Sequence, residues 1–444
     1  MIMPSDHSLP APNVCVNCKA RKKKCDKASP SCGYCTRKGL RCQYRRPKVA
    51  IHYARSIERH LGLVDGAGFN PIARLGLGAT SSSLESTLSL HAQQIISTTG
   101  SQYFDEISVR YFQTVHPYIP IISRERFHTS LITFGATQQA DFAILLLSMC
   151  LLTSRPSLDT DTTALYLSSR SLFLQAQTLC QPSLRLVQAG VLFAVFEYAQ
   201  RSPEQALITV GGCVRMAHTA GLQGPSYLPV PKPAQGGGEV ENSNEHTNTW
   251  WAIMIYERLF LCEQAVIDQP LVSIMPEICL TSAPQDGFRQ AAQAAWLLDR
   301  VLGALSTPDS EDRHTRLQGL DLKLQAFIAM TSEPSLGDSG VYCWAISIAI
   351  RALFLLHHRL LSCDYDGTER SANSSCAALD TLTRMVVDIA ELHKQLSSEK
   401  VDALPPSCRY MLKAAVKEGH SKDSAMQAGL DLLKEVDEHW GRRQ

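Results

Sequence analysis

The chain has 444 residues, of which 45% are hydrophobic, and a net charge of +1 at pH 7. This length gives room for two or three domains with large buried cores, and the composition excludes collagen-like, coiled-coil and wholly disordered chains. The first residues lack the basic start and apolar core of a signal peptide. The longest apolar run, near Ala143, is far shorter than the roughly 20 residues that span a bilayer. We therefore expect an intracellular protein with no membrane partner.

The charge is unevenly divided along the chain. Residues 1–48 contain 12 Lys and Arg against 2 Asp, a charge of +10, whereas the remainder contains 31 basic and 40 acidic residues, a charge of −9. Dense positive charge is typical of a nucleic-acid-binding module, because each Lys or Arg at a phosphate releases condensed counterions. The sequence therefore predicts a basic head that binds nucleic acid and an acidic body that does not bind it alone.

Six of the fifteen cysteines lie between Cys15 and Cys42, spaced C-x2-C-x6-C and repeated after 17 residues. A C-x2-C pair is typical of a zinc site, so two pairs indicate two ions. Two four-coordinate ions need eight ligands, and six thiolates without a histidine can supply them only if two sulfurs bridge. In a reducing compartment, metal binding is favoured over disulfides. The predicted metal ligands are Cys15, Cys18, Cys25, Cys32, Cys35 and Cys42.

These cysteines, with the basic run inside the first half, resemble the fungal binuclear zinc cluster (Zn2Cys6) transcription factors. The resemblance implies two Zn²⁺ ions per chain, with Cys15 and Cys32 as the bridging ligands. It also implies that CGG-like triplets in double-stranded DNA are read through the third and fourth residues after the second cysteine, Arg21 and Lys22. The other basic side chains are expected to contact phosphates: Lys19, Lys23, Lys24, Arg37, Lys38 and Arg41.

The stretch between Cys18 and Cys25, KARKKK, contains no Gly or Pro, so we expect a short helix over residues 19–24. Modules of this kind place a helix in the major groove. There, one or two basic residues can donate to guanine O6 and N7, while the others reach only phosphates. After Cys35, Gly39 weakens a second helix. The run RKKK is also typical of a nuclear import signal, which predicts a nuclear protein.

Residues 49–83 are expected to form a short helix and a flexible linker. Apolar residues between Ala54 and Val64 follow a 3-4-3 spacing over less than two heptads. This leaves two alternatives open, a coiled coil that forms a homodimer and a short helix packed on the body. From Gly62 to Ser83, five glycines and the run ATSSS are typical of a tether.

Residues 84–444 show helical periodicity and no series of alternating strands. Residues 344–361 are apolar around most of the helix circumference, as a buried helix would be. Loops rich in Pro, Gly, Ser and acidic residues are expected at 229–248, 306–314 and 331–340. One helical face is predicted from Leu382, Met385, Val386, Ile389, Leu392 and Leu396.

Three stretches of the body, 111–127, 211–222 and 249–261, are similar to the helical signatures of the same family's middle homology region. The fold class expected is a small two-zinc, six-cysteine cluster domain (1–48) at the N-terminus, a flexible linker, and a large all-α regulatory domain (84–444). The resemblance implies regulation by a small-molecule effector or by a partner such as a coactivator. Trp250, Trp251 and Tyr256 are more typical of a core than of a ligand pocket.

The C-terminal segment, residues 430–440, mixes acidic side chains with Leu432, Leu433, Val436 and Trp440. This composition is compatible with an activation segment that docks on coactivators, and equally with a final helix packed on the body.

The sequence thus predicts a sequence-specific regulator of RNA polymerase II genes, an activator and not an enzyme. By analogy with regulators encoded beside fungal biosynthetic pathways, it would control a secondary-metabolite gene cluster. The alternative is a thiol-based zinc buffer or redox sensor, which explains the cysteines but not the basic head. An enzyme with an appended zinc module is a third class, but the GDSG of residues 337–340 lacks the strands and partners of a serine protease.

Overall fold

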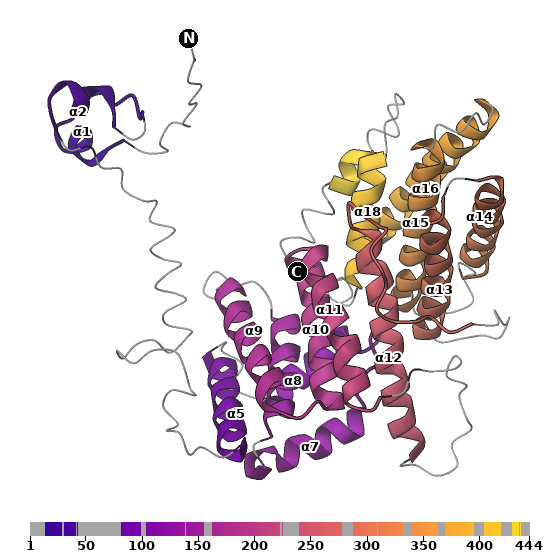
Figure 1. Ribbon diagram of the computed structural model, residues 1–444, viewed down its shortest axis with the longest axis horizontal. Helices are drawn as coiled ribbons and strands as arrows, with labels where there is room; N and C mark the ends of the chain where they lie inside the picture. The colour runs from indigo at the N-terminus through magenta and orange to yellow at the C-terminus, as the bar shows by residue number, and fades with distance from the viewer. Residues whose placement is uncertain are drawn as a thin grey trace. The chain divides into compact units, whose positions relative to one another are not determined.

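The computed structural model divides the chain into two compact units, Met1–Asn70 and Pro71–Gln444 (Figure 1). Among the residues that the structure describes, none is in a strand. This confirms the predicted class, a small cysteine-rich domain and a large all-α domain. The described residues are 14–28, 31–40, 42, 81–98, 104–137, 139–154, 162–222, 224, 239–277, 287–308, 310–331, 339–362, 369–394, 404–418, 429–434 and 436.

The first unit contains two five-residue helices, α1 (Val16–Ala20) and α2 (Gly33–Arg37), which pack on each other. Among the described residues of this unit, the core consists of cysteines instead of aliphatic side chains, with Tyr34 and Leu40 packed at the edge. A core this small cannot supply the free energy of folding by apolar burial, so a bound metal has to contribute it.

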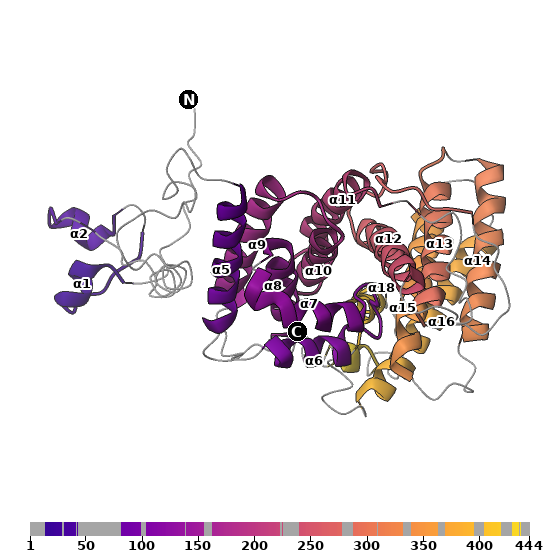
Figure 2. The same ribbon diagram turned by 90° about the horizontal axis from the view of Figure 1, so that it is seen from below.

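In the second unit, the helices before residue 220 surround α8 (Ala140–Thr153), which is apolar on every side. It packs against α5, α6, α9 and α10. Figure 2 shows these helices grouped at one end of the unit. Their bounds are α5 (Ser81–Thr98), α6 (Phe104–Thr114), α7 (Arg124–Thr137), α9 (Thr162–Leu179), α10 (Leu184–Gln200) and α11 (Pro203–Thr219).

The second half of this unit is arranged around α15 (Ser339–Ser362), which packs against α13, α14, α16 and α18. The long helix α12 (Glu239–Cys262) contacts α10 and α11 on one side and α13 and α15 on the other, so it joins the halves into a single core. The remaining bounds are α13 (Gly287–Leu305), α14 (Glu311–Thr331), α16 (Glu369–Lys394) and α18 (Pro406–Glu418).

Side chains at the helix starts explain several of the boundaries. Ser183 precedes α10, and its hydroxyl accepts a hydrogen bond from the N–H of Leu186 at 3.3 Å. Ser202 caps α11 in the same way, and Pro203 follows at the first helical position. A serine cap satisfies an N–H that the helix itself leaves unpaired, and proline has no N–H to satisfy.

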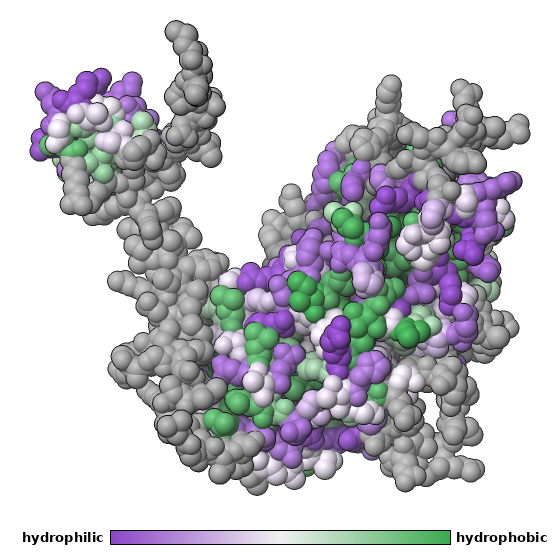
Figure 3. All heavy atoms as spheres, viewed as in Figure 1, coloured by the Kyte–Doolittle hydropathy of each residue, from purple (hydrophilic) through white to green (hydrophobic). Residues whose placement is uncertain are grey.

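Figure 3 shows apolar and polar residues interspersed on one face of the unit.

The apolar stretch Cys343–Leu361 of α15 is, by length and composition, the one segment among the described residues that could cross a membrane. However, 61% of it is buried inside the unit. Trp344, Ile348 and Phe354 are no more than 1% exposed. The prediction of a buried helix at 344–361 is therefore confirmed. The high hydropathy of this segment is that of a core helix, because most of its side chains pack inside the unit.

A buried cluster of polar side chains fixes an extended segment on α12. The Glu257 carboxylate accepts hydrogen bonds from the N–H groups of Val272 (2.6 Å) and Ser273 (3.0 Å). The guanidinium of Arg258 donates to the Ser273 carbonyl oxygen at 2.8 Å and to Asp299 on α13 at 2.9 Å. The pair Glu257 and Arg258 therefore anchors the chain after α12.

Some local expectations were wrong. Leu392 is 64% exposed, whereas the adjacent His393 is buried, because the buried face of α16 runs through Leu382, Val386, Ala390 and His393. The predicted loops at 229–248 and 306–314 overlap the first turns of α12 and α14, and Ser339 of the GDSG stretch begins α15.

The predicted domain limits at 48 and 83 stay predictions, although α5 already begins at Ser81. The coiled-coil candidate between Ala54 and Val64 lies outside the described residues.

Candidate metal centre and nucleic-acid interface

The two halves of the cysteine repeat form the same local structure. Cys15 and Cys32 are the N-cap residues of α1 and α2, both in extended conformation. Each cap sulfur accepts a hydrogen bond from the backbone N–H of the next cysteine, Cys18 or Cys35, at 3.4 Å. The C-x2-C spacing produces this geometry, because residues three apart at a helix start lie on the same side. Each half therefore directs two sulfurs inwards.

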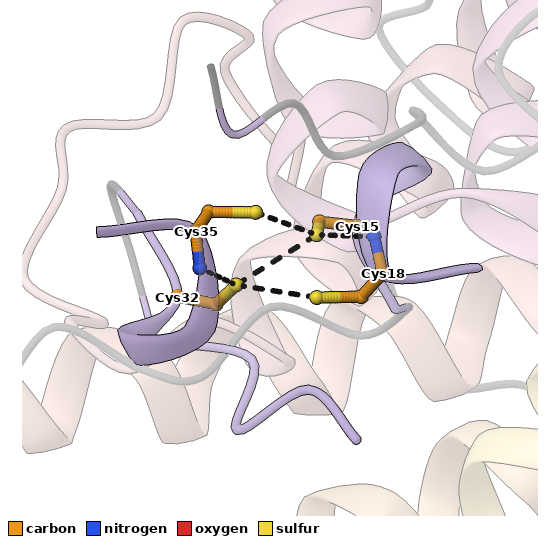
Figure 4. Close-up of side chains that lie close together, drawn as sticks. All are labelled: Cys15, Cys18, Cys32 and Cys35. Carbon is orange, nitrogen blue, oxygen red and sulfur yellow. Dashed lines mark hydrogen bonds between the residues drawn. The ribbon is translucent and has the colours of Figure 1, made fainter. Parts of the chain in front are cut away.

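The four sulfurs of Cys15, Cys18, Cys32 and Cys35 point toward one another from α1 and α2, all within 4.8 Å (Figure 4). The Cys15 sulfur lies 3.7 Å from those of Cys32 and Cys35, and the sulfurs of Cys18 and Cys32 are 3.6 Å apart. Tetrahedral zinc with Zn–S bonds of about 2.3 Å separates its sulfurs by about 3.8 Å. The thiols therefore have the spacing that zinc coordination requires.

The last cysteine of each half approaches the same central pair. Cys25 lies within 4.8 Å of Cys32 and in hydrogen-bonding contact with the thiols of Cys15 and Cys32. Cys42 contacts the same two thiols, and its sulfur accepts a hydrogen bond from the N–H of Cys32 at 3.3 Å. Cys15 and Cys32 thus contact thiols from both halves, an arrangement that fits bridging ligands.

As free thiols, these cysteines differ in acidity. Burial raises the pKa of Cys35 to about 12 and that of Cys18 well above its usual range. The pKa of Cys25 is lowered to about 7: desolvation is the largest single effect and raises it, but hydrogen bonds from the backbone N–H groups of Cys15 and Lys27 outweigh it. A divalent cation bound among the sulfurs would favour all the thiolates, which is the chemistry that zinc supplies here.

The prediction of a helix over residues 19–24 was wrong, because α1 ends at Ala20. Arg21 is the C-cap, and Lys22 adopts a left-handed φ of 49°. The N–H of Lys23 then donates to the Cys18 carbonyl oxygen at 2.9 Å, which closes a Schellman motif. Cys25 has to return to the cluster, so the chain turns back and a continued helix would carry it away.

The basic residues lie on the outside of this turn. Lys19 and the run Arg21–Lys24 are exposed, as are Arg37 and Lys38 in the second half. Arg41 lies outside the described residues. The turn therefore presents adjacent positive charges to solvent directly beside the cysteine core, and their roles at bases or phosphates stay predictions.

One structural residue of the cluster, Asp26, escaped the sequence analysis. Its carboxylate accepts hydrogen bonds from the N–H of Gly33 (2.9 and 3.1 Å) and of Ala28 (3.2 Å). These bonds hold the pKa of Asp26 below its usual value. A Cβ at Gly33 would lie 2.6 Å from the carboxylate, so a side chain there would displace Asp26 from these hydrogen bonds. In the sequence, an acidic residue directly after the third cysteine (Asp26) and a glycine directly after the fourth (Gly33) are the pattern that could have indicated this contact.

Comparison with known proteins identifies both units. A model of the fungal Zn(2)-Cys(6) binuclear cluster domain matches residues 13–50, and a model of the fungal specific transcription factor domain matches residues 109–263. The chain therefore carries two domains of the fungal Zn2Cys6 transcription factors. Both matched models describe domains of DNA-binding transcription regulators, a non-enzymatic class, and the N-terminal model is that of a zinc-binding domain.

Two relatives of this Zn2Cys6 factor are also named transcription factors. Transcription factor BOA15 of Botryotinia fuckeliana is 34% identical over 119 residues, which cover 27% of this chain and 66% of the relative. Transcription factor AN6788 of Emericella nidulans is 28% identical over 158 residues, which cover 33% of this chain and 23% of the relative. The chain thus spans just under two thirds of one relative and less than a quarter of the other.

The helical domain of this Zn2Cys6 factor places its tryptophans in the core. Trp250, Trp251 and Tyr256 are at most 3% exposed on α12. In the C-terminal segment, Leu430, Leu433 and Val436 are buried in the same core. A final helix packed on the body therefore explains residues 430–436 better than a free activation segment does.

Proposed function

We propose that this Zn2Cys6 factor is a nuclear activator that holds two Zn²⁺ ions and recognises CGG-like half-sites through Arg21 and Lys22. The observation that carries the proposal is the exposed basic turn Arg21–Lys24, which leaves the buried cysteine core immediately after α1. Because the core would be rigid when metal is bound, the turn would present its donors to base edges in a fixed geometry.

The ion count rests on the central position of Cys15 and Cys32 between the two halves. Sharing these two sulfurs gives each ion four ligands, with Cys18 and Cys25 at one ion and Cys35 and Cys42 at the other. Metal analysis of the purified protein should return two zinc ions per chain. One ion per chain, with Cys25 and Cys42 open to alkylation, would contradict the bridged cluster.

The division between base and phosphate contacts can be tested with two matched variants of the turn. Lys22→Ala should lower discrimination between cognate and scrambled DNA by about 1–3 kcal/mol, because only base contacts carry sequence information. Lys24→Ala should weaken binding to both DNAs alike and reduce the salt dependence by about one phosphate contact. Equal losses on both DNAs for Lys22→Ala would show that Lys22 contacts only the backbone.

The first experiment is selection of bound sequences from random double-stranded DNA, with the full-length zinc-loaded protein at about 0.15 M salt. Paired CGG-like triplets at one fixed spacing would support both the readout and a homodimer. A lone triplet would indicate a monomer. Absence of enrichment, with zinc verified in the sample, would favour the zinc buffer or redox sensor over a sequence-specific regulator.

The remaining elements of the proposal rest on the family resemblance and on exposed positive charge. The basic turn also supports nuclear import, since import signals require accessible Lys and Arg. A small-molecule effector would fit the cavity of about 380 Å³ beside α11, which is lined by Leu207, Ile208 and Val272 and falls in the usual size range. We also propose that the protein binds a coactivator and controls a secondary-metabolite gene cluster.

A further inference from the structure

A cysteine and a histidine from different helices form a close pair in the helical domain. Cys343 lies near the start of α15, and His393 lies in the last turn of α16. The Cys343 sulfur is 3.2 Å from Nε2 of His393. The two helices pack side by side, as Figures 1 and 2 both show. This contact joins residues 50 positions apart, so it is a product of the tertiary fold.

A second cysteine completes the cluster from a third helix. Cys408 lies in the first turn of α18, and its thiol donates to the carbonyl oxygen of Cys343 at 3.8 Å. Each of these two thiols is also the largest influence on the pKa of the other, which places the sulfurs close together. One turn away, the hydroxyls of Ser347 and Ser407 are 2.7 Å apart and hold α15 against α18. The two sulfurs are therefore neighbours in a fixed frame.

The two cysteines differ in access to solvent. Cys343 is partly exposed, whereas Cys408 is fully buried and His393 is 5% exposed. A small oxidant from solvent would therefore meet Cys343 first. Cys408 would act second, from inside the protein, which is the arrangement of an attacking thiol and a resolving thiol.

The acidity of the two thiols agrees with this order. The pKa of Cys343 is lowered to about 5, chiefly by the hydrogen bond from Cys408 and further by His393. The pKa of Cys408 is raised well above its usual range by the same hydrogen bond and by burial. By contrast, burial raises the pKa of the core thiols Cys213 and Cys262 to about 12. Thiolate character and exposure together mark oxidant-sensitive cysteines.

A metal site explains this cluster less well. In the part of the chain that the structure describes, every group of three or more metal-ligand atoms within 4.8 Å of one another lies in the N-terminal unit. Cys343, His393 and Cys408 thus do not converge on one point as zinc ligands must. Cys343 lies between the other two residues, which suits proton exchange with His393 on one side and disulfide formation with Cys408 on the other.

We infer that Cys343 and Cys408 form a hydroperoxide-sensitive dithiol in the helical domain, with Cys343 as the attacking sulfur and His393 as its positioning partner. The Cys343 sulfur attacks one peroxide oxygen, the O–O bond breaks, and the proton shared with His393 leaves with the other oxygen as water. The Cys408 sulfur then displaces the second oxygen from the sulfenic acid, and its proton completes a second water. The two sulfurs lose the two electrons that reduce hydrogen peroxide to two waters.

The test maps the sulfur chemistry directly in the full-length, zinc-loaded protein. After exposure to hydrogen peroxide at pH 7, free thiols are alkylated and tryptic peptides are analysed by mass spectrometry. We expect peptide 324–351, which contains Cys343, to be linked to peptide 401–409, which contains Cys408, and the link to disappear with dithiothreitol. In Cys408→Ser, the sulfenic acid on Cys343 should persist and be trapped by dimedone.

Two comparisons separate the proposed chemistry from simple exposure. Cys376 is exposed on α16, so if accessibility alone decided the reaction, Cys376 would be oxidised before Cys343. His393→Asn should slow oxidation of Cys343 several-fold, because part of the support for the thiolate is lost. Cys213→Ser, in a buried thiol of α11, should leave the rate unchanged.

Oxidation of Cys376 before Cys343, or a Cys343 that stays fully alkylatable, would overturn the inference. If His393→Asn fails to fold, the wild-type order and the dimedone result with Cys408→Ser still decide it. Because the peptides report the site, oxidation of the zinc ligands cannot be mistaken for this reaction. The result is also independent of DNA binding, so failure of the inference and failure of the proposed function are distinguishable.

Discussion

Lys22 and Gly39 occupy equivalent positions in the two halves of the cysteine repeat, and both have left-handed backbone conformations, with φ of 49° and 60°. Each follows the C-cap of a five-residue helix, and the next residue closes the turn by donating to a cysteine carbonyl oxygen at 2.9 Å. Glycine adopts this conformation freely, whereas lysine is strained there. The predicted base contact of Lys22 gives a physical reason for a lysine at this position.

Lys22→Gly should therefore separate folding of the cluster from DNA recognition. We expect the zinc-loaded unit to gain about 1 kcal/mol of stability from relief of the backbone strain. Discrimination between cognate and scrambled DNA should fall at the same time. Metal retention against a chelator measures the first effect, and competition binding measures the second. A variant that loses zinc would show that Lys22 supports the fold itself.

Gly190 on α10 lies where α9 and α11 approach that helix closely. A Cβ there would lie 2.6 Å from the sulfur of Cys213 on α11 and 3.0 Å from the ring of Phe173 on α9. Gly190→Ala should cost about 1–3 kcal/mol of unfolding free energy, because a packed interior cannot yield that space. In contrast, no atom lies within 4 Å of a Cβ at Gly212. Gly212→Ala should gain about 0.5–1 kcal/mol by helix propensity. Urea unfolding of both variants checks the opposite signs.

Arg258 is 1% exposed and bonds two carboxylates, Glu257 at 3.0 Å and Asp299 at 2.9 Å. Arg258→Met should cost about 3–5 kcal/mol, because removal of the guanidinium leaves buried negative charge without its main partner. Differential scanning calorimetry measures the loss as a lowered Tm. The exposed pair of Arg316 and Asp312 is the control, and Arg316→Met should change stability by less than about 1 kcal/mol. Similar effects at both sites would contradict this reading of the anchor.

His116 gives the helical domain an acid-sensitive element. Desolvation, and to a lesser extent the Arg124 guanidinium, lowers the pKa of His116 to about 4 from its usual value near 6.5. As pH falls below about 6.5, the unfolded chain takes up a proton at this position and the folded chain does not, so stability is lost down to about pH 4. Relative to His116→Gln, the wild type should lose about 2 kcal/mol between pH 7.5 and pH 5. Urea midpoints of both proteins that shift equally with pH would refute the assignment.

The sequence alone determined the features that depend on neighbours in the chain. The two C-x2-C pairs lie within 28 residues, and the loop between them is short. Closing such a short loop costs little entropy, so the thiols of both pairs can be brought together without contacts from the rest of the chain. The basic head and the buried helix at residues 344–361 followed from charge and periodicity in the same local way. For this reason, the cysteine-rich domain and the all-α body could be predicted from the sequence alone.

Only the tertiary structure decided which of several compatible local arrangements exists. The residues after Cys18 have no helix breaker, yet α1 stops at Ala20 because Cys25 must return to the core. Leu392 and His393 are adjacent on α16, and packing against α15 determined that the histidine is buried. Cys343 and Cys408 are 65 residues apart and meet because α15 and α18 share a core. Such contacts depend on how whole helices pack against one another. Which packing has the lowest free energy depends on residues far apart in the chain, so no short-range sequence pattern reveals it.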